Sequence, residues 1–121
     1  MRVLFIGGTG LISSACADLA AARGHALTLL TRGNAPKLPL PAGVETLRAD
    51  VRDRRAVEAA LAGRVFDAVV NWVAFTVAHV EQDVEVFGGR CGQYVFISSA
   101  SAYEKPASRL PVTEETPTRG R

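Results

Sequence analysis

The sequence has few of the residues on which secreted, metal-binding or membrane-spanning proteins depend. Its 121 residues include two cysteines and two histidines, without the spacing of a disulfide framework or a metal site. No apolar run approaches the roughly 20 residues that cross a bilayer. The first apolar run, Val3–Ile6, lies too close to Met1 for a signal peptide to precede it. We therefore expect a soluble cytoplasmic protein with reduced thiols, no metal and no membrane partner.

Blocks of like charge are also absent. The 14 basic and 12 acidic residues give a net charge of only +2 and are spread along the whole chain, which argues against a nucleic-acid-binding arm. With 48% hydrophobic residues, the length and composition fit one globular domain with one core.

Short apolar runs alternate with helical patterns, which is typical of βαβ units around a parallel sheet. The expected strands are Val3–Ile6, Ala26–Leu30, Val44–Leu47, Phe66–Asn71 and Tyr94–Ser98. Right-handed crossovers place these strands in the order 3-2-1-4-5, in a Rossmann-type doubly wound α/β fold. The ligand crevice is then expected at the carboxyl ends of strands one and four, where the strand order reverses.

Three helices are expected between these strands. Gly24 fits the left-handed residue that ends the first helix, and Asp53 and Thr76 are candidate N-caps of the second and third. In the third helix we expect the apolar residues to face the core and the polar ones to face water. The inward set is Val77, Val80, Val84 and Phe87, and the outward set is Glu81, Gln82, Asp83 and Glu85.

A glycine-rich turn joins the first strand to the first helix, in the segment Gly7-Gly8-Thr9-Gly10-Leu11-Ile12-Ser13. Gly7 permits the tight turn, and Gly10 lets a pyrophosphate approach the backbone. The amides that open the helix carry about half a positive charge. The alternative is a glycine-rich turn without a ligand. The context favours dinucleotide binding by Gly7, Thr9, Gly10, Leu11 and Ile12.

This turn is similar to the GxxGxxG turn of the short-chain dehydrogenase/reductase superfamily. Its wording GGTGLI most resembles the extended branch, the NAD-dependent epimerase/dehydratase-like proteins. The resemblance implies an NAD(P) cofactor. Ser13 stands where that branch usually has a third glycine, so we expect a slightly shifted helix rather than lost binding.

The adenosine end departs from NAD-preferring members, in which an acidic residue ends the second strand. Thr31 and Arg32 occupy that place, and a guanidinium suits the 2′-phosphate of NADP. NADP is therefore expected over NAD, the alternative being that Arg32 is a solvated loop residue. Asp50 and Val51 resemble the family's acidic-apolar pair at the adenine ring, although Asp50 fits a local cap equally well.

Two further segments carry the resemblance. Val73 and Ala74 are similar to the family's turn beneath the cofactor, whereas Trp72 is expected in the core rather than in the wall of a substrate crevice. Ser99 matches the strand-end serine that precedes an aromatic by four residues, which implies a catalytic hydroxyl bonded to the substrate. The family's YxxxK motif is absent, because Tyr103 has Ala107 at the lysine position.

We expect residues 1–104 to form the NAD(P)-binding domain, and residues 105–121 an extended loop or disordered tail leading to a missing C-terminal part. The chain is then the N-terminal fragment of an epimerase, dehydratase or reductase-like oxidoreductase, inactive alone. Its full-length parent would take a small, sugar-nucleotide-like substrate and is compatible with an oligomer. The alternatives are a non-catalytic dinucleotide-sensing protein and, less favoured by the charge, an RNA-binding relative.

Overall fold

Strands and helices alternate along the chain in the computed structural model, which describes residues 1–7, 10–32, 40–74, 76–97 and 114–115. The strands are β1 (Arg2–Ile6), β2 (Ala26–Thr31), β3 (Glu45–Arg48), β4 (Phe66–Asn71) and β5 (Cys91–Phe96). The helices are α1 (Leu11–Ala22), α2 (Arg54–Leu61) and α3 (Val77–Phe87). In this described part no helix has the length and apolar character needed to cross a membrane.

The five strands form one parallel sheet in the order β3-β2-β1-β4-β5. This confirms the expected Rossmann-type order. β1 is central, and its last residue, Ile6, pairs with Leu30 of β2 and with Asn71 of β4. The chain therefore leaves β1 and β4 at the same level of the sheet, on either side of the point where the order reverses.

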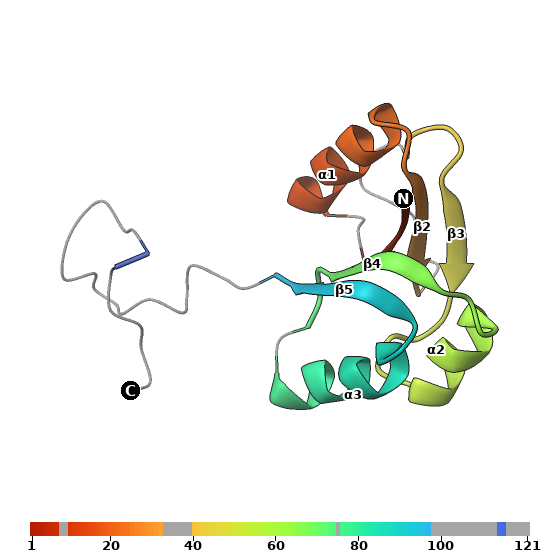
Figure 1. Ribbon diagram of the computed structural model, residues 1–121, viewed down its shortest axis with the longest axis vertical. Helices are drawn as coiled ribbons and strands as arrows, with labels where there is room; N and C mark the ends of the chain where they lie inside the picture. Colours follow the sequence, from red (N-terminus) through yellow and green to blue (C-terminus); the bar gives the residue numbers. More distant parts are fainter. Residues whose placement is uncertain (8–9, 33–39, 75, 98–113, 116–121) are drawn as a thin grey trace.

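The helices cover both faces of the sheet, with α1 on one face and α2 and α3 on the other (Figure 1). Each face has its own apolar core, as strands covered on both sides require. The α1 side buries Val3, Phe5, Ala17, Leu27 and Leu29. The α2–α3 side buries Leu4, Ile6, Leu30, Ala49, Val57, Leu61, Phe66, Val69, Val86 and Phe87.

The helix ends follow the residues expected to set them. The Asp53 carboxylate accepts hydrogen bonds from the amides of Arg55 and Ala56, and the Thr76 hydroxyl accepts one from His79. Such caps are typically worth about 1 kcal/mol each. Gly24, just past α1, has a φ of +81°, the left-handed conformation that glycine adopts without steric cost.

The observed bounds match the expectation only for β4. β1 begins one residue earlier than expected, at Arg2, β2 ends one residue later, at Thr31, and β5 ends at Phe96 instead of Ser98, which lies outside the described residues. β5 begins at Cys91, three residues before Tyr94, because parallel pairing of Cys91 with Phe66 and of Gln93 with Ala68 extends the ladder. Cys91-Gly92-Gln93 has little apolar character, so pattern alone did not mark it as strand. β3 is shifted by one residue, to Glu45–Arg48.

The buried face of α3 also differs from the expectation. Val77 and Val84 are 74% and 61% exposed, whereas Asp83 is 5% exposed and is buried beside Val86 and Phe87. The expected inward set was therefore wrong for Val77 and Val84, and the expected outward set was wrong for Asp83. A carboxylate tolerates such a position only when it is hydrogen-bonded, and partners on β4 and β5 provide those bonds.

Candidate functional site

A cavity of about 420 Å³ lies at the carboxyl ends of β1 and β4, where the strand order reverses. This is the position at which doubly wound sheets bind ligands. Its lining comprises Gly7, Gly10, Leu11, Ile12, Ser13, Trp72, Val73 and Ile97. Five of the expected cofactor-binding residues meet there: Gly7, Gly10, Leu11, Ile12 and Val73. The structure adds three that the expected cofactor set did not include: Ser13, Trp72 and Ile97.

Gly7 is required by the backbone. It has a φ of +88°, which side-chain-bearing residues rarely adopt. A Cβ atom at this position would also lie 2.9 Å from Val73 Cγ1. The position therefore requires glycine, because the turn after β4, which carries Val73, passes close to it.

Gly10 has ordinary extended backbone angles, and among the described residues an added Cβ would meet only Ser13 Oγ, at 3.6 Å. Glycine is favoured at an N-cap, and it also allows the close approach of a ligand. The first i→i−4 bond of α1 runs from the Ser14 amide to the Gly10 carbonyl, so the amides of Leu11 and Ile12 precede the bonded turns. No acidic residue stands in this first turn, and its positive end is left for an anion.

The Ser13 side chain is hydrogen-bonded to the backbone of Gly10, where α1 begins. Its Oγ accepts a hydrogen bond from the Gly10 amide at 3.0 Å and donates one to the Gly10 carbonyl at 3.2 Å. A side chain three residues after an N-cap that bonds back to the N-cap amide is one half of a capping box, but Glu or Gln usually occupies that position. No clear sequence signal therefore marked this role of Ser13.

Trp72 combines the two functions that the sequence left open. Its ring packs edge-on against Phe5, with centroids 5.4 Å apart, and so belongs to the α1-side core. It also lines the cavity beside Val73. Ala74, by contrast, is buried and does not line the cavity.

The residues expected at the adenosine end do not line this cavity and lie at the ends of β2 and β3. Arg32 and Asp50 form an exposed ion pair, with Arg32 Nε 3.8 Å from Asp50 Oδ1. Asp50 Oδ1 also accepts from the Arg52 amide at 2.9 Å, so it makes the local bond that the sequence left open. Thr31 is buried, and Val51 packs on the α2–α3 core.

Two expected site residues, Thr9 and Ser99, lie outside the described residues. Their roles remain predictions from the sequence. Ile97, the last described residue before Ser99, lines the cavity.

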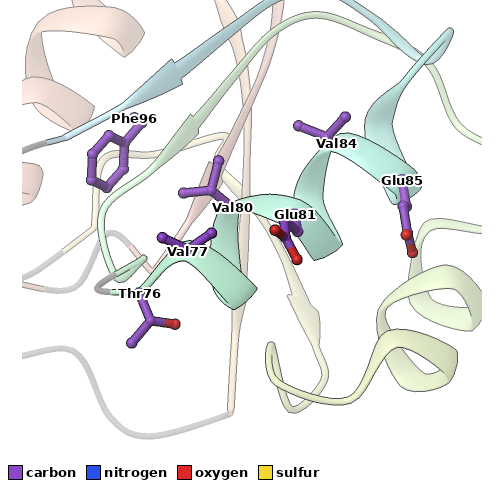
Figure 2. Close-up of a pocket in the computed structure, with 7 residues that line it drawn as sticks. All are labelled: Thr76, Val77, Val80, Glu81, Val84, Glu85 and Phe96. Atoms are coloured by element: carbon purple, nitrogen blue, oxygen red, sulfur yellow. The ribbon is translucent and has the colours of Figure 1, made fainter.

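A second hollow, of about 640 Å³, lies on the outer side of α3. Figure 2 shows Val77, Val80 and Val84 of α3 along it, with Phe96 of β5 at one end. Glu81 and Glu85 also line it, and their charges oppose a phosphate group. This apolar groove is therefore unsuited to the anionic part of a dinucleotide.

The family model for the NAD dependent epimerase/dehydratase family matches residues 3–89, which include the glycine turn and the first four strands. The chain belongs to this family. The family's model thus covers all the residues that line the cavity except Ile97, including Gly7, Gly10 and Val73.

Curated relatives of the family are longer. The chain is 29% identical to the chloroplast stem-loop binding protein of 41 kDa b from Arabidopsis thaliana, covering 94% of this chain and 33% of that protein. It is 30% identical to 2'-dehydrokanamycin reductase from Streptomyces kanamyceticus, covering 96% and 32%. The chain thus spans about a third of the length of either relative.

A solved structure has the same fold. UDP-glucose 4-epimerase from Bifidobacterium longum, in complex with NAD+ and UDP, superposes with a TM-score of 0.76 at 24% identity, covering 99% of this chain and 43% of that one. The Rossmann-type architecture of this chain is therefore shared with that enzyme.

Proposed function

We propose that this chain binds a nicotinamide dinucleotide, with the pyrophosphate on the amides that open α1. The observation that carries the proposal is the cavity between the glycine turn and β4, lined by Gly7 and Gly10. The backbone conformation of Gly10 does not require glycine, and the missing side chain leaves room for a ligand. The first turn of α1 beside it contains no acidic residue. The pyrophosphate site is thus made of backbone.

In this proposal Thr9, Leu11 and Ile12 contact the phosphates, and Val73 forms the floor near the nicotinamide, with the buried Ala74 next to it in the chain. When bound, the cofactor supplies or accepts a hydride. Ser99 is proposed to hold the substrate by donating a hydrogen bond to a carbonyl or hydroxyl oxygen.

At the adenosine end, Thr31 and Arg32 lie near the ribose, and Asp50 and Val51 near the adenine. We propose that NADP is preferred over NAD. Arg48 Nε donates to the Arg32 carbonyl at 3.1 Å, which brings a second guanidinium to this end. Two such groups favour a 2′-phosphate.

We propose that the full-length protein is an epimerase, dehydratase or reductase that acts on a sugar-nucleotide-like substrate. The UDP bound to the epimerase of the same fold supports this substrate class. Residues 1–104 are proposed as the dinucleotide-binding domain of this protein, located in the cytoplasm. Without a YxxxK motif, the chain alone is expected to bind cofactor without turnover, because it lacks a general acid/base worth about 10²–10⁴-fold.

The test is a titration of the chain with NADH and NADPH. Trp72 is the only tryptophan and lines the cavity, so energy transfer from Trp72 to the reduced nicotinamide reports binding directly. Gly10→Ala should lower the melting temperature only slightly, because glycine is preferred to alanine at an N-cap, and weaken both ligands by about tenfold. Binding by neither dinucleotide at millimolar concentration, or full binding by Gly10→Ala, would contradict the proposal.

A second candidate function is recognition of a nucleic-acid stem-loop, because one relative is named as a stem-loop binding protein. A labelled stem-loop RNA tests it in a mobility-shift titration. Specific nucleic-acid binding should weaken steeply with salt. No shift at low ionic strength would remove this candidate, whatever the dinucleotide titration gives.

A further inference from the structure

Asp83 is a buried carboxylate whose hydrogen bonds join three elements of the fold. It lies on α3 and is 5% exposed. Asn71 Nδ2 at the end of β4 and the Tyr94 hydroxyl of β5 both donate to Asp83 Oδ2, at 2.5 Å each. Burial, followed by the bond to Asp83, raises the pKa of Tyr94 well above its ordinary value, so Tyr94 remains a donor at neutral pH.

Asn71 connects Asp83 through hydrogen bonds to Val73, which lines the cavity. It is 2% exposed, and its Oδ1 accepts from the Val73 amide at 2.8 Å. A carboxylate only accepts hydrogen bonds, whereas an amide group has a donor at one end and an acceptor at the other. Asp83 therefore determines that the oxygen of Asn71, and not its nitrogen, faces the Val73 amide.

Val73 lies in the turn that follows β4, next to the glycine turn. Its side chain is the nearest neighbour that a Cβ at Gly7 would meet, and it lines the cavity. A different orientation of the Asn71 amide would turn an N–H donor toward the Val73 N–H and displace this turn. The hydrogen bonds thus run from Asp83 through Asn71 to the floor of the crevice.

We propose that Asp83 is a positioning residue for the bound dinucleotide, because it orients Asn71 and thereby fixes Val73 under the cofactor. This inference rests on the proposed function. It assigns to the carboxylate on α3 a role in ligand affinity beyond its contribution to stability.

The test exchanges the two partners. Asn71→Asp places two carboxylates against each other and should weaken NADH binding by about tenfold. Adding Asp83→Asn to that variant restores a donor facing an acceptor, while the carboxylate introduced on β4 still offers an oxygen to the Val73 amide. The double variant N71D/D83N should bind NADH within about threefold of the unaltered chain.

Tyr94→Phe is the matched structural control. It removes a donor from the same Asp83 oxygen but leaves the Asn71 bond to Val73, so the melting temperature should fall while NADH affinity changes by less than about twofold. The chemical shift and exchange rate of the Val73 amide, measured by NMR, give a readout that stability alone does not move. They should change in Asn71→Asp and return in the double variant.

Four outcomes overturn the inference: unchanged binding by Asn71→Asp, no recovery in the double variant, a Val73 amide unaffected by Asn71→Asp, or a Tyr94→Phe loss of affinity as large as that of Asn71→Asp. If Asn71→Asp does not fold, Asp83→Ala takes its place with the same expected loss. An unaltered chain that binds no dinucleotide overturns the proposed function as well. An unaltered chain that binds while the variants bind equally overturns this inference alone.

Discussion

The proposed phosphate end of the crevice is built from backbone, whereas the proposed adenosine end presents an exposed ion pair. At the first, Gly7 has a positive φ and Ser13 fixes the Gly10 amide. At the second, Arg32 and Asp50 form an ion pair open to solvent. Backbone geometry tolerates little change, while exposed charges are exchanged at small cost in stability. Under the proposed function, we expect the first region to determine whether a dinucleotide binds and the second to determine which one.

The largest expected effect is that of Gly7→Ala. A φ of +88° and a contact of 2.9 Å with Val73 Cγ1 both oppose a methyl group, and backbone strain of this kind costs about 1–3 kcal/mol. Urea denaturation should show that loss of unfolding free energy. Gly10→Ala serves as the control, with little change in stability. Equal stability of Gly7→Ala and Gly10→Ala would contradict the claim that the backbone requires glycine at position 7.

Ser13→Ala should have the next largest effect. Removing the hydroxyl that bonds the Gly10 amide should cost about 1 kcal/mol of stability. NADH affinity should fall a few-fold, because the turn loses a constraint. Both are measured on the same sample by melting and by Trp72 energy transfer. Ser13→Thr keeps the hydroxyl and is the control.

Arg32→Ala should change selectivity rather than stability. The expected loss is about fivefold in NADPH affinity, with NADH affinity nearly constant, since an exposed charge pair is worth up to about 1 kcal/mol. Unfolding free energy should change by less than about 0.5 kcal/mol, as for other exposed pairs. Tighter binding of NADH than NADPH by the unaltered chain would reject the role given to Arg32.

The smallest expected effect is that of Asp50→Asn. The amide oxygen keeps the bond to the Arg52 amide, while the charge facing Arg32 is lost. NADPH should bind about two- to threefold more tightly, because Arg32 is no longer shared with a carboxylate. The gain should disappear at high salt, which screens exposed charges. An unchanged NADPH affinity would mean that the pair is irrelevant to the ligand.

Much of the fold was predictable because its signals are local. Apolar runs marked the strands, Asp53 and Thr76 marked helix starts, and crossover handedness gave the strand order. The five residues gathered at the crevice followed from the glycine turn and from where parallel strands end.

The rest depended on contacts between distant segments. The burial of Asp83 follows from donors on β4 and β5, 12 and 11 residues away in sequence, and no helical pattern reveals them. The start of β5 depends on pairing with β4. The bond of Ser13 to Gly10 is local, but serine is not the usual capping-box residue at this position, so the sequence did not predict the bond.

Two side-chain hydrogen bonds connect segments that we propose bind opposite ends of the dinucleotide. Arg52 Nη2, beyond β3, donates to the Val73 carbonyl at 2.5 Å, and Gln82 Nε2 of α3 donates to the Val51 carbonyl at 2.9 Å. These bonds connect the loop that we propose faces adenine with the turn that we propose faces nicotinamide. By the reciprocity of linked equilibria, a fragment that occupies only the adenine end should slow hydrogen exchange at Val73, and the two halves of a dinucleotide should bind better joined than their separate affinities suggest.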